Sequence, residues 1–323
     1  MMNKDIKIYI AGHRGLAGSA IQRELLRQGY TNIVTRTHSE LDLEDAAATL
    51  SFFEQEKPGL VFLAAAKVGG IHANNTYPVD FLMSNLRIEA NICSAAYETR
   101  VNRLIFLGSS CIYPRDCPQP IKEEYLLTGP LEATNRPYAL AKIAGIEMCW
   151  SYNRQYGTKW LAAMPTNLYG PGDNYDLSNS HVLPALIRKM HEAKAAEAKE
   201  VVLWGSGTPK REFLYVDDLA NALVFLAMLD DARYDTLVDP SRCPLINVGS
   251  GEDLTIRELA ETIAEVVGYK GDFVQDASKP DGTMRKIMDV SRIKVLGWEK
   301  EKSLKEGIAL SYLDMLSMNK GKL

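Results

Sequence analysis

Three glycines at regular spacing follow the first apolar run of the chain. The string Gly12-His-Arg-Gly15-Leu-Ala-Gly18 lies between a β-branched segment at residues 6–10 and a segment of helical period at residues 16–28. Glycines at such a junction allow a tight turn and let a pyrophosphate approach backbone N–H groups at the positive end of the helix. They can also form a sharp turn that binds nothing, but the position directly after the first strand favours a dinucleotide site.

Short apolar runs alternate with longer segments of helical period over the first 250 residues. This alternation predicts an α/β fold, a Rossmann-type doubly wound parallel sheet with helices on both faces. The expected strands are residues 6–10, 32–35, 60–65, 104–108, 160–165 and 246–249, and the expected helices are residues 16–28, 79–100, 138–156 and 217–228.

The pattern changes near residue 171, where a polar loop precedes an expected helix at 181–198 and an expected strand at 201–204. A chain of 323 residues exceeds the usual size of a single hydrophobic core. We therefore predict a dinucleotide-binding domain formed by residues 1–172 and 213–250. A smaller mixed α/β substrate domain would comprise residues 173–212 and 251–323, and the cleft between the two domains is the expected ligand site.

Composition excludes several classes of function. The net charge of −4, without a dense block of Lys and Arg, argues against a nucleic-acid partner. An odd number of cysteines without a C-x-x-C pair argues against a disulfide framework and against a structural zinc site, and we expect no metal. No apolar run is long enough for a signal peptide or a membrane span, so we expect a cytoplasmic protein with no membrane partner. The five cysteines are Cys93, Cys111, Cys117, Cys149 and Cys243.

Arginine stands where dinucleotide domains usually carry an acidic residue. The acidic side chain at the end of the second strand normally binds the ribose 2′-hydroxyl, but this chain has Arg36 there and Arg14 in the glycine loop. Two guanidinium groups suit a 2′-phosphate, although both could be ordinary solvated arginines. The pattern predicts NADP(H) rather than NAD as the cofactor.

Tyr138 and Lys142 share one face of an expected helix, because they are four residues apart. A nearby ammonium should lower the pKa of Tyr138, while burial would oppose part of that effect. A tyrosine tuned in this way can protonate a carbonyl oxygen while hydride arrives at the carbon. A surface helix pair is the plain alternative, but Ser109, just beyond the strand at 104–108, adds a hydroxyl at the carboxyl edge of the sheet.

These motifs resemble the extended short-chain dehydrogenase/reductase family over essentially the whole chain. The similar strings are GxxGxxG at Gly12–Gly18, LAAAKVGG at Leu63–Gly70, Ser109 with Tyr138 and Lys142, and REFLYVDDLA at Arg211–Ala220. Three further strings resemble the branch of this family that converts GDP-4-keto-6-deoxymannose to GDP-L-fucose with NADPH. They are GSSCIYP at Gly108–Pro114, HVLPALIRK from His181 and KPDGTMRKIMD from Lys279.

The resemblance implies roles for individual residues. Ser109, Tyr138 and Lys142 match the reductase triad, and Cys111 and His181 match an acid/base pair that epimerises C3 and C5. From the residues alone, Cys111 could equally be a small buried side chain, and His181 could be a capping or surface histidine. The expected cofactor-binding residues are Gly12, His13, Arg14, Gly15, Leu16, Ala17, Gly18, Arg36, Leu107, Gly108, Ser109, Ser110, Lys142, Pro165, Thr166, Asn167, Leu168 and His181.

The resemblance places Lys189, Trp204, Arg211 and Asp281 at a GDP-sugar site, where cations and an aromatic face suit a diphosphate and a base. Each has a plain structural alternative: a solvated lysine, a core tryptophan or a loop ion pair. Asp217, by contrast, is expected to cap the helix that follows it.

The expected helix at 138–156 carries apolar residues on more than one face, which predicts a homodimer in agreement with the resemblance. Its apolar residues include Leu140, Ile143, Ile146, Met148, Cys149 and Trp150.

Two other functions compete with the epimerase–reductase. One is a nucleotide-sugar 4-epimerase or 4,6-dehydratase, but a dehydratase should carry a carboxylate near the position of Cys111. The other is a non-catalytic NADP-binding sensor, which would tolerate the loss of Ser109, Tyr138 or Lys142, yet all three are present.

Overall fold

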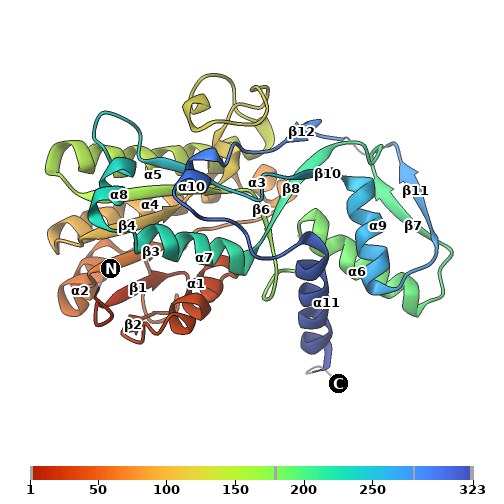
Figure 1. The fold of residues 1–323 in the computed structure, drawn as a ribbon, viewed down its shortest axis with the longest axis horizontal. Coiled ribbons are helices and arrows are strands. Elements are labelled where there is room, and N and C mark those ends of the chain that lie inside the picture. Colours follow the sequence, from red (N-terminus) through yellow and green to blue (C-terminus); the bar gives the residue numbers. More distant parts are fainter. Residues whose placement is uncertain (1–2, 178–179, 279–280, 321–323) are drawn as a thin grey trace.

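A six-stranded parallel sheet forms the centre of the larger of two parts in the computed structural model (Figure 1), which describes residues 3–177, 180–278 and 281–320. Residues 279 and 280 of the string that begins at Lys279 lie outside the described residues. The strand order is β2-β1-β3-β4-β5-β9, and every pairing is parallel. These strands are β1 (Ile8–Ala11), β2 (Ile33–Val34), β3 (Leu60–Leu63), β4 (Arg103–Leu107), β5 (Lys159–Pro165) and β9 (Leu245–Val248).

Helices cover both faces of this sheet, so its inner strands are buried apolar runs. Helices α1 (Leu16–Arg27) and α7 (Val216–Ala227) contact each other, while α4 (Pro78–Glu98) contacts both α2 (Ala46–Glu56) and α5 (Arg136–Tyr156). The prediction of a Rossmann-type doubly wound α/β fold is confirmed. Short helices α3 (Ile71–Thr76), α8 (Asp231–Leu237) and α10 (Ser291–Val295) lie in the connections.

Asp217 does not cap α7, contrary to our expectation. The helix begins one residue earlier, at Val216, and its N-cap residue is Tyr215. Asp217 therefore lies in the first turn, where its Oδ1 is 2.5 Å from Arg23 Nη2 of α1. The carboxylate still lies at the positive end of the helix, but it joins α7 to α1 instead of closing the first turn.

Among the described residues, the smaller part contains three helices and short sheets. Helices α6 (Val182–Ala195) and α9 (Ile256–Val267) lie beside the parallel pair β7 (Glu200–Trp204) and β11 (Asp272–Asp276), and α11 (Leu304–Lys320) contacts α9. A separate sheet joins the two parts, because its strand β6 continues directly from β5. That sheet contains β6 (Asn167–Tyr169), β8 (Lys210–Tyr215), β10 (Asp253–Thr255) and β12 (Arg285–Lys286).

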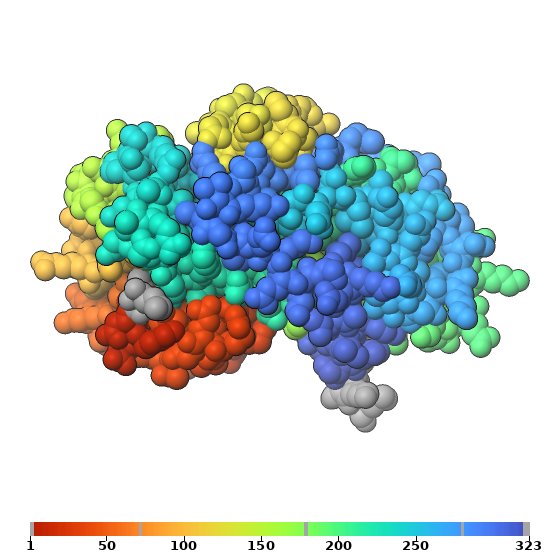
Figure 2. All heavy atoms as spheres, in the orientation of Figure 1, coloured from red at the N-terminus to blue at the C-terminus, as the bar shows by residue number. Residues whose placement is uncertain are grey.

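Buried apolar side chains form two clusters that correspond to these parts. The segment after β12 returns to the larger cluster through Met288, Ile293 and Trp298. Ile121 forms a parallel bridge with Met288, and the space-filling view shows the yellow segment that follows β4 lying against the blue one (Figure 2). The proposed domain boundaries at residues 172/173, 212/213 and 250/251 stay a prediction. No helix among the described residues is long and apolar enough to cross a membrane.

Candidate active site

A cavity of about 690 Å³ opens at the carboxyl edge of the large sheet. The chain runs from β1 outward to β2 and then returns to β3 on the other side of β1, so the strand order reverses between β1 and β3. Ligands of open α/β sheets bind at such a switch point. The cavity wall comes from the loops after β1, β2, β3, β4 and β5, together with residues of α4 and α5, His181 directly before α6, and β12.

The glycine loop has the shape that a pyrophosphate requires. Gly12 has a φ of +85°, and a Cβ there would lie 2.8 Å from the Cα of Ala65 in the loop after β3. A Cβ on Gly18 would overlap the carbonyl group of Gly12, so α1 can pack closely on the turn. Gly15 is the N-cap residue of α1 and leaves the first N–H groups of the helix without a side-chain partner. A dinucleotide fits this loop.

Most of the expected cofactor residues line the cavity, and three do not. Gly18 is buried beneath the turn, Arg14 is exposed, and His13 has a buried Nδ1 without a hydrogen-bond partner among the described residues. Their binding roles stay a prediction. The residues that do line the cavity are Gly12, Gly15, Leu16, Ala17, Arg36, Leu107, Gly108, Ser109, Ser110, Lys142, Pro165, Thr166, Asn167, Leu168 and His181.

Ser109, Tyr138 and Lys142 meet at the floor of the cavity. Ser109 lies two residues after the end of β4, whereas Tyr138 and Lys142 lie one turn apart on α5. The Nζ atom of Lys142 is 5.9 Å from the centre of the Tyr138 ring and donates to the Leu107 carbonyl oxygen at 3.1 Å. The fold therefore brings two separate sequence motifs to one place.

The expected lowering of the Tyr138 pKa is wrong. Burial raises the pKa of Tyr138 well above its ordinary value, and the negative forms of Cys111 and Glu89 raise it further. The charge of Lys142 is opposed by Glu89, whose Oε1 lies 3.2 Å from Lys142 Nζ. The sequence argument included Lys142 but missed this carboxylate, which lies about fifty residues earlier on α4.

Cys111 lies in the short turn after Ser109, and its N–H donates to Ser109 Oγ at 3.5 Å. Burial raises the pKa of the Cys111 thiol, and the positive charge of Lys286 is the largest influence that lowers it. Lys286, on β12, lines the same cavity, and burial lowers its own pKa. We did not single out Lys286, although it lies within the string that begins at Lys279 and is one of its two basic residues past Gly282.

His181 lines the cavity from the smaller part of the structure, directly before α6. It is the N-cap residue of α6, but its side chain makes no capping hydrogen bond, so the imidazole is available to the cavity that it lines. Desolvation by surrounding protein lowers the pKa of His181. The alternative that the His181 side chain caps α6 is therefore wrong. A neutral imidazole at this position can accept or donate a proton.

The four expected GDP-sugar residues lie outside the cavity wall but form two pairs beside it. Lys189 Nζ lies 5.1 Å from the centre of the Trp204 ring, and that indole is 62% exposed, so Trp204 is not a core residue. Asp281 Oδ1 accepts from Ser206 N at 2.6 Å, and the charge of Asp281 raises the pKa of Arg211 while burial lowers it more. The charge of Arg211 in turn lowers the pKa of Lys286. A row of charged side chains thus runs from Asp281 toward Cys111.

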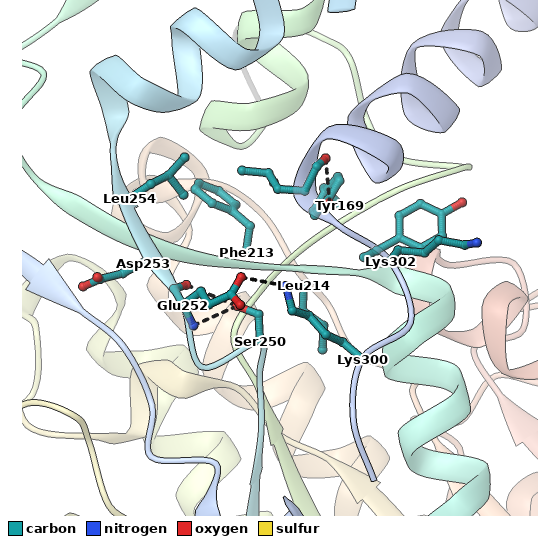
Figure 3. A pocket seen from close by; sticks show the side chains of 11 residues that line it. Tyr169, Phe213, Leu214, Ser250, Glu252, Asp253, Leu254, Lys300 and Lys302 are labelled. Atoms are coloured by element: carbon teal, nitrogen blue, oxygen red, sulfur yellow. Dashed lines mark hydrogen bonds and ion pairs between the residues drawn. The ribbon is translucent and has the colours of Figure 1, made fainter.

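A second cavity, of about 210 Å³, contains none of the expected site residues. It lies where the two parts meet, between Tyr169 and Phe213 on one side and the Ser250–Glu252 loop on the other (Figure 3). Lys300 closes one edge through an ion pair with Glu252 at 2.7 Å. No group of three or more metal-binding side chains occurs in the described part of the chain.

Comparison with known proteins identifies relatives along nearly the whole chain. The model of the NAD dependent epimerase/dehydratase family matches residues 8–236. GDP-L-fucose synthase from Escherichia coli is 57% identical over 306 residues, which cover 95% of each chain. GDP-L-fucose synthase 1 from Arabidopsis thaliana is 57% identical over 312 residues, covering 97% of this chain and 94% of the relative.

A solved structure also has a similar fold along nearly the whole chain. The GDP-D-glycero-L-gluco-heptose synthase from Campylobacter jejuni, determined in the presence of NADPH, is 37% identical with a TM-score of 0.90, covering 98% of this chain and all of that chain (100%). The resemblance predicted from the motifs is confirmed. This chain belongs to the NAD dependent epimerase/dehydratase family and, within it, to the GDP-L-fucose synthases.

Proposed function

We propose that the protein converts GDP-4-keto-6-deoxy-D-mannose to GDP-L-fucose, by epimerisation at C3 and C5 followed by reduction of the C4 ketone. The cofactor is NADP(H), which agrees with the NADPH in the related C. jejuni structure. One observation carries the proposal: the triad and the Cys111–His181 pair line the same cavity as the glycine loop. A reductase alone would need only the triad.

NADPH supplies hydride to C4 when it is bound. The backbone of the Gly12–Gly18 loop holds the pyrophosphate, and Arg36 binds the 2′-phosphate from the cavity wall. Pro165 and Thr166, at the end of β5, flank the nicotinamide end. Thr166 is fixed there because its Oγ1 donates to the Glu212 carbonyl oxygen at 3.2 Å.

Tyr138 gives its phenolic proton to the C4 oxygen during the reduction. Ser109 Oγ donates a hydrogen bond to the same oxygen, and the ammonium of Lys142 stabilises the phenolate that forms. The structure supports these roles because Ser109 and Tyr138 both line the cavity, and Lys142 lies beneath the Tyr138 ring.

Cys111 and His181 exchange protons with C3 and C5. Both carbons flank the C4 ketone, so removing either proton places charge on the same enolate oxygen, which Ser109 and Tyr138 hold. Inversion needs a base and an acid on opposite faces of the sugar. Cys111 projects from the turn after β4 and His181 from α6, so the two come from different walls of the cavity.

The smaller domain, residues 173–212 and 251–323, binds the GDP portion in this proposal. The Lys189–Trp204 pair offers a cation and an exposed aromatic face, and Arg211 with Asp281 offers a charged hydrogen-bonding pair. Lys286 connects this surface to Cys111. The sugar would therefore lie between the two pairs and the triad.

The proposal includes a cytoplasmic homodimer. Leu140 on α5 and Met83 on α4 are 40% and 38% exposed, which supports a partner on this apolar helix face. Trp150, by contrast, donates to the Pro240 carbonyl oxygen of its own chain, so part of the second face of α5 is covered internally. Free thiols at all five cysteines support a reducing compartment.

The decisive experiment incubates the protein with NADPH and GDP-4-keto-6-deoxymannose and identifies the sugar by NMR. GDP-L-fucose with stoichiometric NADPH oxidation is the expected result. A GDP-6-deoxyhexose of the D series would remove the epimerase half of the proposal. Turnover without net NADPH oxidation would indicate a 4-epimerase, and binding of NADPH without any turnover would indicate a sensor.

A further inference from the structure

A buried carboxylate lies directly beneath the triad. Glu89 on α4 and Lys142 on α5 have side chains that are only 1% and 2% exposed, and Glu89 Oε1 is 3.2 Å from Lys142 Nζ. Lys142 also lines the cavity and donates to the Leu107 carbonyl oxygen. Glu89 is therefore one contact away from the reacting centre, through a residue of the triad.

The surroundings of Glu89 differ from those of a carboxylate that only stabilises the fold. Glu212, equally buried, accepts from Gly251 N at 2.7 Å and from Met288 N at 2.9 Å. Neither oxygen of Glu89 has a hydrogen bond of good geometry among the described residues. A buried carboxylate without such donors is costly, and its one charged partner in the described part of the chain is the triad lysine.

The helix opposite keeps space for this carboxylate. A Cβ on Gly145 would lie 2.9 Å from Glu89 Oε2 and would overlap the ring of Phe106. Glycine in the middle of a helix such as α5 costs about 1 kcal/mol relative to alanine. Gly145 therefore lowers the stability of α5 at this position but leaves room for Glu89. Alanine there would displace the carboxylate or the Phe106 ring.

Glu89 changes charge near neutral pH. Burial raises the pKa of Glu89 to about 7, and Lys142 opposes that shift. The other groups that respond to its charge are Tyr138 and Cys149 on α5, and the Cys149 thiol also forms a hydrogen bond with the Cys93 thiol on α4. When Glu89 is ionised it neutralises Lys142. When Glu89 is protonated, the charge of Lys142 acts alone on Tyr138.

We propose that Glu89 is a positioning residue for the reduction: it holds Lys142 at the cavity floor and supplies the proton that restores Tyr138. The C4 oxygen takes the Tyr138 proton, Lys142 passes one proton to the phenolate, and Glu89 passes its proton to the Lys142 amine. Glu89 then carries the negative charge and regains a proton from water through Lys142, which lines the cavity. This inference rests on the proposed function.

The test compares the pH dependence of single-turnover NADPH oxidation in wild type and Glu89→Gln. In wild type the rate should fall as pH rises through about 7, because ionised Glu89 cancels the Lys142 charge and makes Tyr138 a weaker acid. Glutamine keeps the shape but never ionises, so in a single turnover, which is complete before Tyr138 is restored, the variant should lose this limb of the pH profile and keep the low-pH rate. At alkaline pH its single turnover should be faster than that of wild type by about tenfold. Repeated turnover requires Tyr138 to be restored, so under those conditions the variant should be slower than wild type.

The matched control is Glu24→Gln. Glu24 is also buried, but it pairs with Arg27 on α1 and lies outside the cavity wall, so this variant should keep the wild-type limb. A limb that persists unchanged in Glu89→Gln overturns the inference. If Glu89→Gln does not fold, Glu89→Asp decides: a moved midpoint supports the inference and an unchanged midpoint overturns it. Wild type that fails to oxidise NADPH with this sugar overturns the proposed function, and the inference with it.

Discussion

The Arg36 guanidinium is held by Glu56, with Arg36 Nη2 lying 2.7 Å from Glu56 Oε1. Its Nη1 donates to the Thr35 carbonyl oxygen at 2.8 Å, and the group lies 5.2 Å from the centre of the Phe52 ring. These contacts fix a positive charge just after β2, where the cavity wall receives the adenosine ribose in this fold. The guanidinium is thus oriented before any phosphate arrives.

Arg36→Ala should weaken NADPH binding much more than NADH binding, because only NADPH carries the 2′-phosphate. The loss should be about tenfold to a hundredfold, the range for a hydrogen bond between charged groups. Titration calorimetry with both nucleotides measures it. Arg233→Ala is the control, since it removes a surface arginine that pairs with Asp230 outside the cavity wall. Equal affinity of wild type for NADH and NADPH would contradict this role of Arg36.

Tyr138→Phe should abolish most reduction while it retains some solvent deuterium incorporation at C3 and C5. The ring still packs edge-on against Phe81 at 6.4 Å, so the fold should survive, but the proton for the C4 oxygen is gone. A general acid typically contributes a factor of about 10² to 10⁴. NADPH oxidation and NMR of the sugar in deuterated water report the two steps separately. Reduction near the wild-type rate would show that another group donates the proton.

Local patterns predicted the sheet and the glycine loop well. The strand at 60–65 and the helix at 16–28 were predicted from the spacing of apolar residues, which depends only on neighbours a few positions away. They differ from β3 and α1 only at their ends. The spacing of apolar residues does not determine the residue at which a helix begins. For this reason we expected Asp217 to cap α7, whereas the helix begins at Val216. The strands of the joining sheet were not predicted. The shortest of them, β12, has two residues and depends on its pairing with β8.

The electrostatics of the site depend on contacts between distant segments. Lys142 was expected to lower the pKa of Tyr138 from its place one helical turn away. Glu89 opposes the Lys142 charge from another helix, and burial, the largest influence, raises the pKa of Tyr138 in the same direction as Glu89. Lys286 comes close to Cys111 only because β12 pairs with β8, more than 170 residues after the turn that holds Cys111. Spacing in the sequence carries no information about such pairs.

Lys286→Met should move the pH dependence of deuterium exchange at C3 and C5 to higher pH. The charge of Lys286 lowers the pKa of the Cys111 thiol and so opposes the effect of burial. Without that charge the pKa of the thiol should be higher, and less thiolate should be present at a given pH. Each unit of upward shift should slow exchange about tenfold below the pKa. Exchange followed by NMR across pH measures it. Lys294→Met, an exposed lysine outside the cavity wall, should leave the profile unchanged. The same midpoint in Lys286→Met and wild type would contradict the coupling.

Cys111→Ala should separate the two halves of the reaction, because it removes the proposed base and leaves Tyr138, Lys142 and the nucleotide loop intact. NADPH should still be oxidised, but the product should be an unepimerised GDP-6-deoxyhexose of the D series with little deuterium at C3 or C5. Cys117→Ala is the matched control: burial also raises the pKa of that thiol and Lys286 also acts on it, yet it lies outside the cavity wall, so GDP-L-fucose should form as in wild type. A cysteine that only packs costs modest stability when truncated and leaves the stereochemistry of the product alone. GDP-L-fucose with full deuterium exchange from Cys111→Ala would therefore assign Cys111 to packing and transfer the base role to His181, the other titratable side chain proposed for this step.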